Sequence, residues 1–209
     1  MPQYNGARFL REALEFLCSQ VFEDWTLLIG DNYSTDETPQ ICKELAARDR
    51  RINCIRRNKK LGPHANFIKL LEAADAEYFM WADCDDVWLP DYLRMCINNL
   101  DQHQEYRFTA TTLVNIDSYG TVIREYSDFH KPAGKWGIAT IVRFLNAPEI
   151  MGNANLIYDL YRLGICRDAL RRSSLPNNFG GRRLFRPRSL EFLGRNHPFE
   201  ASFLQAHRP

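Results

Sequence analysis

Apolar residues in the first hundred positions alternate between the spacing of helices and the spacing of strands. Four segments place apolar side chains three and four positions apart, which predicts helices at 7–20, 34–49, 63–75 and 89–100. Shorter apolar runs between them predict strands at 25–31, 52–57 and 78–82. This alternation predicts an α/β fold with a mostly parallel sheet and helices on both of its faces.

Polar residues and a proline mark where the first two helices should begin. Asn5 stands directly before the first helical segment, and Asp36 stands at the start of the second, so both are predicted to cap helices. Pro39 falls in the predicted first turn of the second helix, where its missing amide hydrogen costs nothing. We therefore expect Asp36 to serve the helix rather than a ligand.

The pattern changes after residue 106. Two segments separated by Ser118-Tyr119-Gly120 predict an antiparallel hairpin at 108–117 and 121–126. Beyond Pro176 neither a helical nor a strand period persists. The chain is therefore expected to form two halves of one domain and an irregular tail, at 1–105, 106–175 and 176–209.

Charge is distributed unevenly between the front of the chain and the tail. From Arg162 onward ten arginines face three acidic residues, so residues 1–161 carry −6 of a total net charge of +1. The basic tail could contact anionic lipid headgroups, which would make the protein membrane-associated. Its aromatic residues do not alternate with the arginines as a stacking platform would require, so no nucleic-acid partner is expected.

The six cysteines are scattered, and no C-x-x-C pair occurs among them. This spacing argues against a zinc site and against a disulfide scaffold, and it predicts buried thiols in a reducing compartment. No apolar run approaches the roughly 18 residues that span a bilayer, and no signal peptide is recognised. The sequence therefore predicts a cytoplasmic protein.

Three polar loops follow predicted strands or strand positions, at 2–5, 30–36 and 83–86. In an open α/β sheet such loops converge at the carboxyl ends of the strands, where ligands bind. The carboxylates of the third loop would repel one another unless a cation lies between them, and Mg²⁺ or Mn²⁺ suits carboxylate ligands. Asp31, Asn32 and Ser34 suit a base and a ribose, so a nucleoside diphosphate bridged to the protein by a metal is expected.

The order and wording of these loops resemble the family 2 glycosyltransferases of the GT-A fold, which is Rossmann-like. The matching pieces are Pro2-Gln3-Tyr4-Asn5, the run from Asp31 to Thr38, and Asp83-Cys84-Asp85-Asp86. The connecting segment at 47–67 keeps Gly62 and Asn66 of the family pattern but has Lys60 where an asparagine is usual. The resemblance covers residues 1 to about 170.

This resemblance implies that a sugar moves from a nucleoside diphosphate sugar to a glycan, lipid-linked or protein acceptor. It implies metal dependence and an inverting mechanism, with donor binding in the first half and acceptor binding in the second. By this resemblance the metal lies at Asp85 and Asp83. The residues assigned to the donor nucleotide are Pro2, Tyr4, Asn5, Asp31, Asn32, Ser34 and Asp83.

Two features depart from the family pattern. A strand should lead into residues 2–5, yet only Met1 precedes them, so the sheet is expected to lack its first strand. Family members carry an acidic base near the position of Arg182 and Arg183, and arginine stays protonated at any working pH. The nearby Asp168 is expected to be a helix cap. No catalytic base is therefore predicted.

Two alternatives remain open at this point. The chain could be a catalytically impaired fragment that binds the nucleotide sugar and transfers it poorly. Asp83-Cys84-Asp85-Asp86-Val87 also fits the D-x-D-x-[TV] motif of haloacid-dehalogenase-like phosphohydrolases. In that class the motif stands near the start of its domain, whereas about 80 residues precede it here.

Overall fold

The structure is a computed structural model, and it describes residues 1–109, 111, 113–117, 119–125, 158–172 and 205–207. The predicted acceptor-side loops and most of the predicted tail lie outside these residues. Within them, no helix is both long enough and apolar enough to cross a bilayer.

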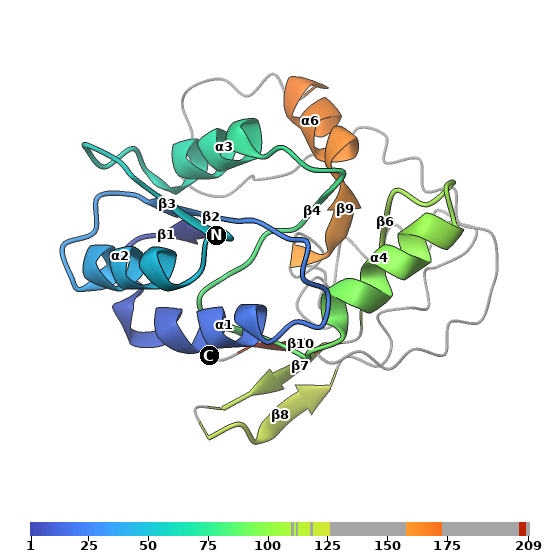
Figure 1. Cartoon of the computed structure of the whole chain (residues 1–209), viewed down its shortest axis with the longest axis horizontal. Helices are drawn as coiled ribbons and strands as arrows, with labels where there is room; N and C mark the ends of the chain where they lie inside the picture. Colours follow the sequence, from blue (N-terminus) through green and yellow to red (C-terminus); the bar gives the residue numbers. More distant parts are fainter. Residues whose placement is uncertain (110, 112, 118, 126–157, 173–204, 208–209) are drawn as a thin grey trace.

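Three parallel strands form the centre of the first half. They are β1 (Pro2–Gln3), β2 (Leu27–Asp31) and β3 (Ile52–Arg56), paired in the order β1-β2-β3. The place of the expected missing strand is therefore filled over two residues by β1. The helices that connect and follow the strands are α1 (Ala7–Cys18), α2 (Thr38–Arg48) and α3 (Pro63–Ala73). In Figure 1, α3 covers one face of this sheet while α1 and α2 cover the other.

The apolar periods seen in the sequence fill a core on each face of the sheet. On one face Leu10 and Leu14 of α1 pack with Ile29 of β2, and all three side chains are almost completely buried. On the other face Leu70 and Leu71 of α3 pack in a second cluster. Burial of one such side chain contributes about 1.5–3 kcal/mol, which explains why the sheet needs both layers.

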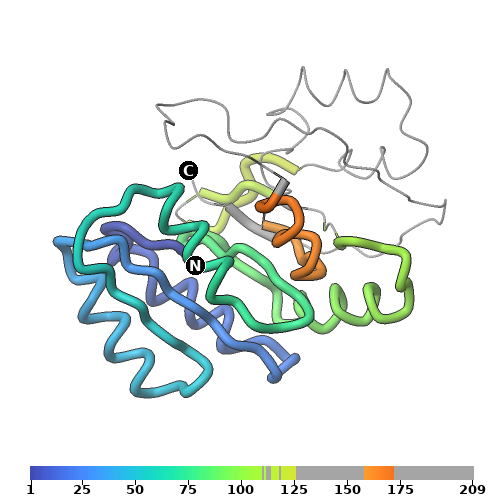
Figure 2. Tube along the Cα trace, turned by 90° about the horizontal axis from the view of Figure 1, so that it is seen from above, coloured from blue at the N-terminus to red at the C-terminus, as the bar shows by residue number. Residues whose placement is uncertain are grey.

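The second half adds strands that pair in a different way. β4 (Tyr78–Phe79) runs antiparallel to β9 (Leu160–Arg162), which also pairs antiparallel with β6 (Phe108–Thr109). α4 (Tyr92–Gln102) and α6 (Leu163–Arg172) flank them. Figure 2 shows α4 at the opposite end of the molecule from α1 and α2. The parallel order predicted from the sequence thus holds for the first three strands, and the predicted strand at 78–82 is reduced to two residues.

A third sheet contains the predicted hairpin. β7 (Leu113–Ile116) and β8 (Val122–Glu125) pair antiparallel, and Gly120 in their turn has a φ of 82°. β10 (Gln205–His207), from the predicted irregular tail, lies between β7 and β5 (Asp86–Trp88). The predicted hairpin is confirmed, but the segment that begins at Phe108 is divided between two sheets.

The expectation that Asp168 caps a helix is wrong. α6 begins at Leu163, so Asp168 lies inside the helix, where its carboxylate is 3.4 Å from the Arg171 guanidinium. The sequence suggested a cap because aspartate is common at helix starts. The antiparallel pairing of β9 instead ends at Arg162, and the helix begins directly after it.

All six cysteines are free thiols, but the prediction that they are buried holds fully for only two of them. Cys42 and Cys96 are buried, whereas Cys18 is exposed.

A buried carboxyl group lies beside β9, at Asp159. The side chain is 3% exposed, and its Oδ2 has no hydrogen-bond partner among the residues that the structure describes. Tyr92 and Cys96 of α4 and Tyr161 of β9 are titratable side chains close enough to interact with it. Burial raises the pKa of Asp159 well above its usual range, so the folded protein favours the protonated carboxyl.

Replacing Asp159 with asparagine should make the protein more stable at neutral pH. In the unfolded chain the carboxyl ionises near pH 4, while in the folded protein it keeps its proton to a higher pH. Folding stability is therefore lost as pH rises above about 4, by up to about 1.4 kcal/mol per pH unit until the folded pKa is reached. In urea titrations from pH 4 to 8, Asp159→Asn should match the wild type at pH 4 and exceed it by more than about 1 kcal/mol at pH 7.

The exposed residue Asp168 provides a control for this substitution. Asp168→Asn makes the same substitution at an exposed position of α6, so it controls for the change of carboxylate to amide without removing a buried group. Parallel stability curves for Asp159→Asn and the wild type would show that Asp159 is ionised in the folded protein.

Candidate functional site

The loop after β1 and the loop after β2 are joined by hydrogen bonds around Asn5. Asn5 has a φ of 54°, and its amide donates to Ser34 Oγ at 2.9 Å. Its side-chain Oδ1 accepts a hydrogen bond from the Thr35 amide at 2.9 Å. The prediction that Asn5 caps α1 is therefore wrong: Gly6 is the cap residue, and the Asn5 side chain holds the neighbouring loop instead.

Asp36 connects the first turns of two helices. Its Oδ1 accepts from the Thr38 amide, at the first residue of α2, at 3.0 Å, so Asp36 bonds the start of that helix as expected although Glu37 is the cap residue. Its Oδ2 accepts from the Ala7 amide of α1 at 3.1 Å, so one carboxylate serves both helices. The Gly6 amide donates to Thr38 Oγ1 at 2.9 Å beside it. These contacts fix the first two predicted loops relative to each other.

Asp31 ends β2 with its side chain almost fully buried. Its Oδ1 accepts from the Ser34 amide at 2.9 Å. Its Oδ2 has no hydrogen-bond partner among the described residues, and Arg56 Nε approaches it to only 3.5 Å. A buried carboxylate oxygen without a donor is costly, so Asp31 has an acceptor available for a ligand.

Asn32 and Asn66 hold the segment that follows β3. Asn32 Oδ1 accepts from the Leu61 amide at 2.8 Å, so this oxygen is already used within the protein. Asn66 of α3 donates from Nδ2 to the Gly30 carbonyl at 2.7 Å and accepts from Arg57 Nε at 3.2 Å. Arg57 Nη2 is buried without a hydrogen-bond partner in the described part of the chain. The end of β3 therefore offers an available donor next to the strand that carries Asp31.

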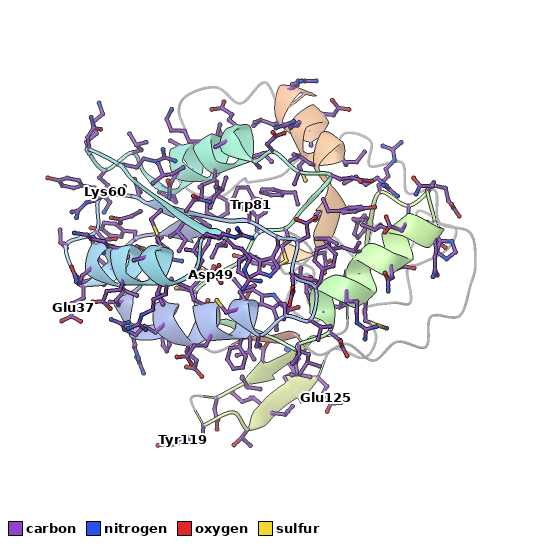
Figure 3. The ribbon with its side chains drawn as sticks, viewed as in Figure 1. Glu37, Asp49, Lys60, Trp81, Tyr119 and Glu125 are labelled. Carbon is purple, nitrogen blue, oxygen red and sulfur yellow. The ribbon has the colours of Figure 1, made fainter. Side chains whose placement is uncertain are left out.

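Tyr4 and Lys60 meet beyond the end of β2. The strand register aligns Gln3, Asp31 and Arg56. The loops that follow β1 and β3 therefore both leave the sheet beside Asp31. The Lys60 ammonium lies 3.7 Å from the centre of the Tyr4 ring, and 44% of Tyr4 is exposed. Figure 3 shows Lys60 on the loop after β3, on the same side of the molecule as Glu37.

The third predicted loop places two carboxylates and a thiol together. Ligand atoms of Asp83, Cys84 and Asp85 all lie within 4.8 Å of one another. Burial, reinforced by the charges of Asp83 and Asp85, raises the pKa of Cys84 to about 12. The thiol is therefore protonated near neutral pH, and the anionic ligands are the two carboxylates. Asp86 is buried within β5 and belongs to the sheet rather than to this group.

Residues that the sequence analysis did not single out hold the third loop. Cys84 is hydrogen-bonded to the side chain of Gln3, which is buried in β1. The Cys84 sulfur also packs close to Gly6, where a Cβ would lie 3.3 Å from it. Tyr158, near the start of β9, donates from its hydroxyl to Asp83 Oδ2 at 3.1 Å. Apart from the position of Gln3 within the first motif, no local sequence signal marks these contacts.

The structure therefore brings the three predicted loops to one edge of the sheet. Among the predicted donor residues, Asn5, Asn32 and Ser34 use their polar atoms on neighbouring loops. Tyr4, Asp31, Asp83 and Asp85 also lie on these loops or strand ends, and Pro2 lies in β1 beside Gly30. A parallel sheet covered by helices, with polar loops at its strand ends, is the arrangement of the GT-A fold.

The chain belongs to glycosyl transferase family 2, whose family model matches residues 1–191. It is 33% identical to EpsE of Bacillus subtilis over 57% of this chain and 44% of the relative. It is also 33% identical to the dTDP-rhamnosyl transferase RfbG of Shigella flexneri, over 48% of this chain and 36% of the relative. Family membership leaves the phosphohydrolase alternative without support.

Solved structures agree on the fold. S. aureus TarS 1-349 in complex with UDP has a TM-score of 0.56 and 19% identity, over 80% of this chain and 46% of that chain. The chain spans less than half the length of EpsE and of RfbG.

Removing the Asp36 carboxylate should destabilise the protein by about 2 kcal/mol, because two helix caps are lost and each is worth about 1 kcal/mol. Glu37→Ala is the matched control, since Glu37 is the neighbouring acidic residue and makes no side-chain cap. Urea denaturation of Asp36→Ala and Glu37→Ala measures the difference. Equal stability of the two variants would show that the Asp36 bonds contribute nothing.

Proposed function

We propose that this chain binds a nucleoside diphosphate sugar and transfers the sugar to an acceptor. The observation that carries the proposal is the buried Asp31 carboxylate, whose Oδ2 has no hydrogen-bond partner among the described residues. Asp31 lies at the end of β2, near the loop that carries Asp83 and Asp85. The Asp31 carboxylate suits a nucleobase, and the carboxylates of Asp83 and Asp85 suit a diphosphate with a cation. Family membership supports the transfer reaction.

The proposed base has an N–H group beside a carbonyl oxygen. Asp31 Oδ2 would accept from the N–H, and Arg57 Nη2 would donate to the carbonyl; neither atom has a hydrogen-bond partner in the described structure, and Asp31 Oδ2 has only Arg56 Nε at 3.5 Å. Arg57 directly follows β3, and its amide donates to the Asp31 carbonyl at 2.9 Å. Uracil, thymine and guanine have such an edge, whereas adenine and cytosine do not. The UDP complex of TarS supports this choice.

Asp83 and Asp85 would hold Mg²⁺ or Mn²⁺ at the diphosphate. Carboxylate oxygens are the ligands that these cations prefer, and the donor set here contains two of them beside a protonated thiol. A bound cation would neutralise the charge that develops on the departing diphosphate. Tyr4 would contribute a ring face for the base, and Pro2, Asn5, Asn32 and Ser34 would shape the loops around it.

The acceptor side carries the least structural support. An inverting transfer needs a base to deprotonate the acceptor hydroxyl. The position of Arg182 and Arg183, where an acid is expected, lies outside the described residues. We propose that the chain binds its donor in the cytoplasm but transfers sugar slowly, with a loss on the order of 10²–10⁴-fold from the missing base.

The proposal is tested first by a thermal-shift screen of UDP, dTDP, GDP, ADP and CDP with Mn²⁺. We expect at least one of the first three to raise the melting temperature and the last two to leave it unchanged. If no nucleotide binds by this screen or by calorimetry, the proposed function is wrong.

Asp31→Asn should weaken binding of the preferred nucleoside diphosphate by about 10- to 100-fold. The substitution removes a charged hydrogen-bond acceptor worth about 1.5–3 kcal/mol, and it should do so with or without metal. Asp91→Asn, exposed at the start of α4, is the matched control and should bind normally. Calorimetric titration of each variant gives the affinities. Normal binding by Asp31→Asn would place the base elsewhere.

Asp85→Ala should abolish only the part of nucleotide affinity that depends on Mn²⁺. The cation loses one of its two carboxylates, while contacts with the base are unaffected. Titrations with Mn²⁺ and with a chelator separate the two parts, and circular dichroism checks the fold. A variant that keeps the full Mn²⁺ effect would exclude Asp85 as a ligand.

A further inference from the structure

Tyr158 reaches the carboxylate loop because of how β9 pairs with β4. The antiparallel register joins Tyr78 to Arg162 and Phe79 to Tyr161. The residues that follow β4 lead to Asp83, and those that precede β9 lead back to Tyr158, whose hydroxyl bonds to Asp83. A residue 75 positions away in the sequence is thereby delivered to the first carboxylate of the loop.

Both oxygens of Asp83 receive a hydrogen bond from a neutral group. Oδ1 accepts from the Cys84 amide at 2.8 Å, and Oδ2 accepts from the Tyr158 hydroxyl at 3.1 Å. No lysine or arginine in the described part of the chain forms an ion pair with Asp83. Neutral donors fix the direction of a carboxylate without cancelling its charge, and each oxygen keeps a lone pair. This is the arrangement that a cation ligand requires.

Tyr158 is suited to this task by its surroundings. It is partly buried, and its hydroxyl donates to Asp83 Oδ2. A tyrosine hydroxyl has one proton to donate, and here that proton is directed at the carboxylate. Its neighbour Leu160 is buried in β9, so the backbone that carries Tyr158 is anchored in the sheet.

We propose that Tyr158 is a positioning residue of the donor site, which orients the Asp83 carboxylate for a divalent cation. The inference rests on the proposed function, since it assigns a supporting partner to one of the proposed metal ligands. Partners of this kind typically account for 10- to 100-fold in metal affinity. The Tyr158–Asp83 hydrogen bond also means that the proposed cation ligand Asp83 is oriented by a residue from the second half of the domain.

The test compares Tyr158→Phe with Tyr78→Phe. Tyr78 lies on β4, next to β9, and its hydroxyl also bonds to an aspartate, Asp101, away from the carboxylate loop. Both variants therefore remove one tyrosine hydroxyl that bonds to an aspartate. Binding of Mn²⁺ is measured by electron paramagnetic resonance of the free ion, alone and with UDP. Binding of UDP is also measured by calorimetry in the presence of a chelator.

We expect Tyr158→Phe to weaken Mn²⁺ binding by about 10-fold or more and to leave UDP binding without metal unchanged. Tyr78→Phe should alter neither, even if it lowers the melting temperature as much. In an Asp83→Asn background, Tyr158→Phe should change Mn²⁺ affinity by less than about 2-fold, because the coupled pair is already broken. This cycle separates the Asp83 contact from any other role of the hydroxyl.

The outcomes distinguish this inference from the proposed function. If the wild type binds Mn²⁺ and loses it in Asp83→Asn, but Tyr158→Phe binds Mn²⁺ normally, the role of Tyr158 is overturned and the donor site stands. An equal loss from Tyr158→Phe in the wild-type and Asp83→Asn backgrounds also overturns it. Failure of the wild type to bind either Mn²⁺ or any nucleotide would reject the proposed function itself.

Discussion

The alignment of three strand ends is the constraint on which the site depends. Gln3, Asp31 and Arg56 lie side by side in the parallel sheet, so the loops that follow β1, β2 and β3 must leave at the same level. Asp36 then fixes two of these loops by bonding the first turns of α1 and α2 with one carboxylate. A shift of one residue between β1 and β2 would move the Tyr4 loop away from Asp31. The same shift between β2 and β3 would move the Arg57 segment away from it.

The elements that could be predicted are those whose signal is local. The first three helices and the strands β2 and β3 follow from apolar periods of a few residues. The predicted cap at Asn5 failed because tertiary contacts decide where its side chain bonds, and Thr35 lies 30 positions away. The pairing of β4 with β9 could not be predicted from local patterns either, since it joins residues more than 80 positions apart.

The candidate site was predictable to a similar extent. The first two motifs come together because β1 and β2 are neighbours in a parallel sheet. The third motif follows β4, which belongs to another sheet, and meets the first through contacts of Cys84 with Gln3 and Gly6. What the motifs could not reveal is how each polar atom is used. Asn32 and Asn5 hold loops, Asp31 keeps a free oxygen, and Asp86 is buried in a strand. Tyr158 carries no local signal, since an isolated tyrosine before a short strand resembles many others.

The antiparallel pairing of β9 with β4 has a consequence for the order in which the site forms during folding. Contacts at the base end join residues within the first 66 positions, through strand–helix–strand units with short loops to close. The carboxylate end needs residues 158–162, which come far later in the chain. Because distant contacts form more slowly than local ones, the two ends of the site should mature at different times. A chain still emerging from the ribosome would complete the contacts around Asp31 before those around Asp83.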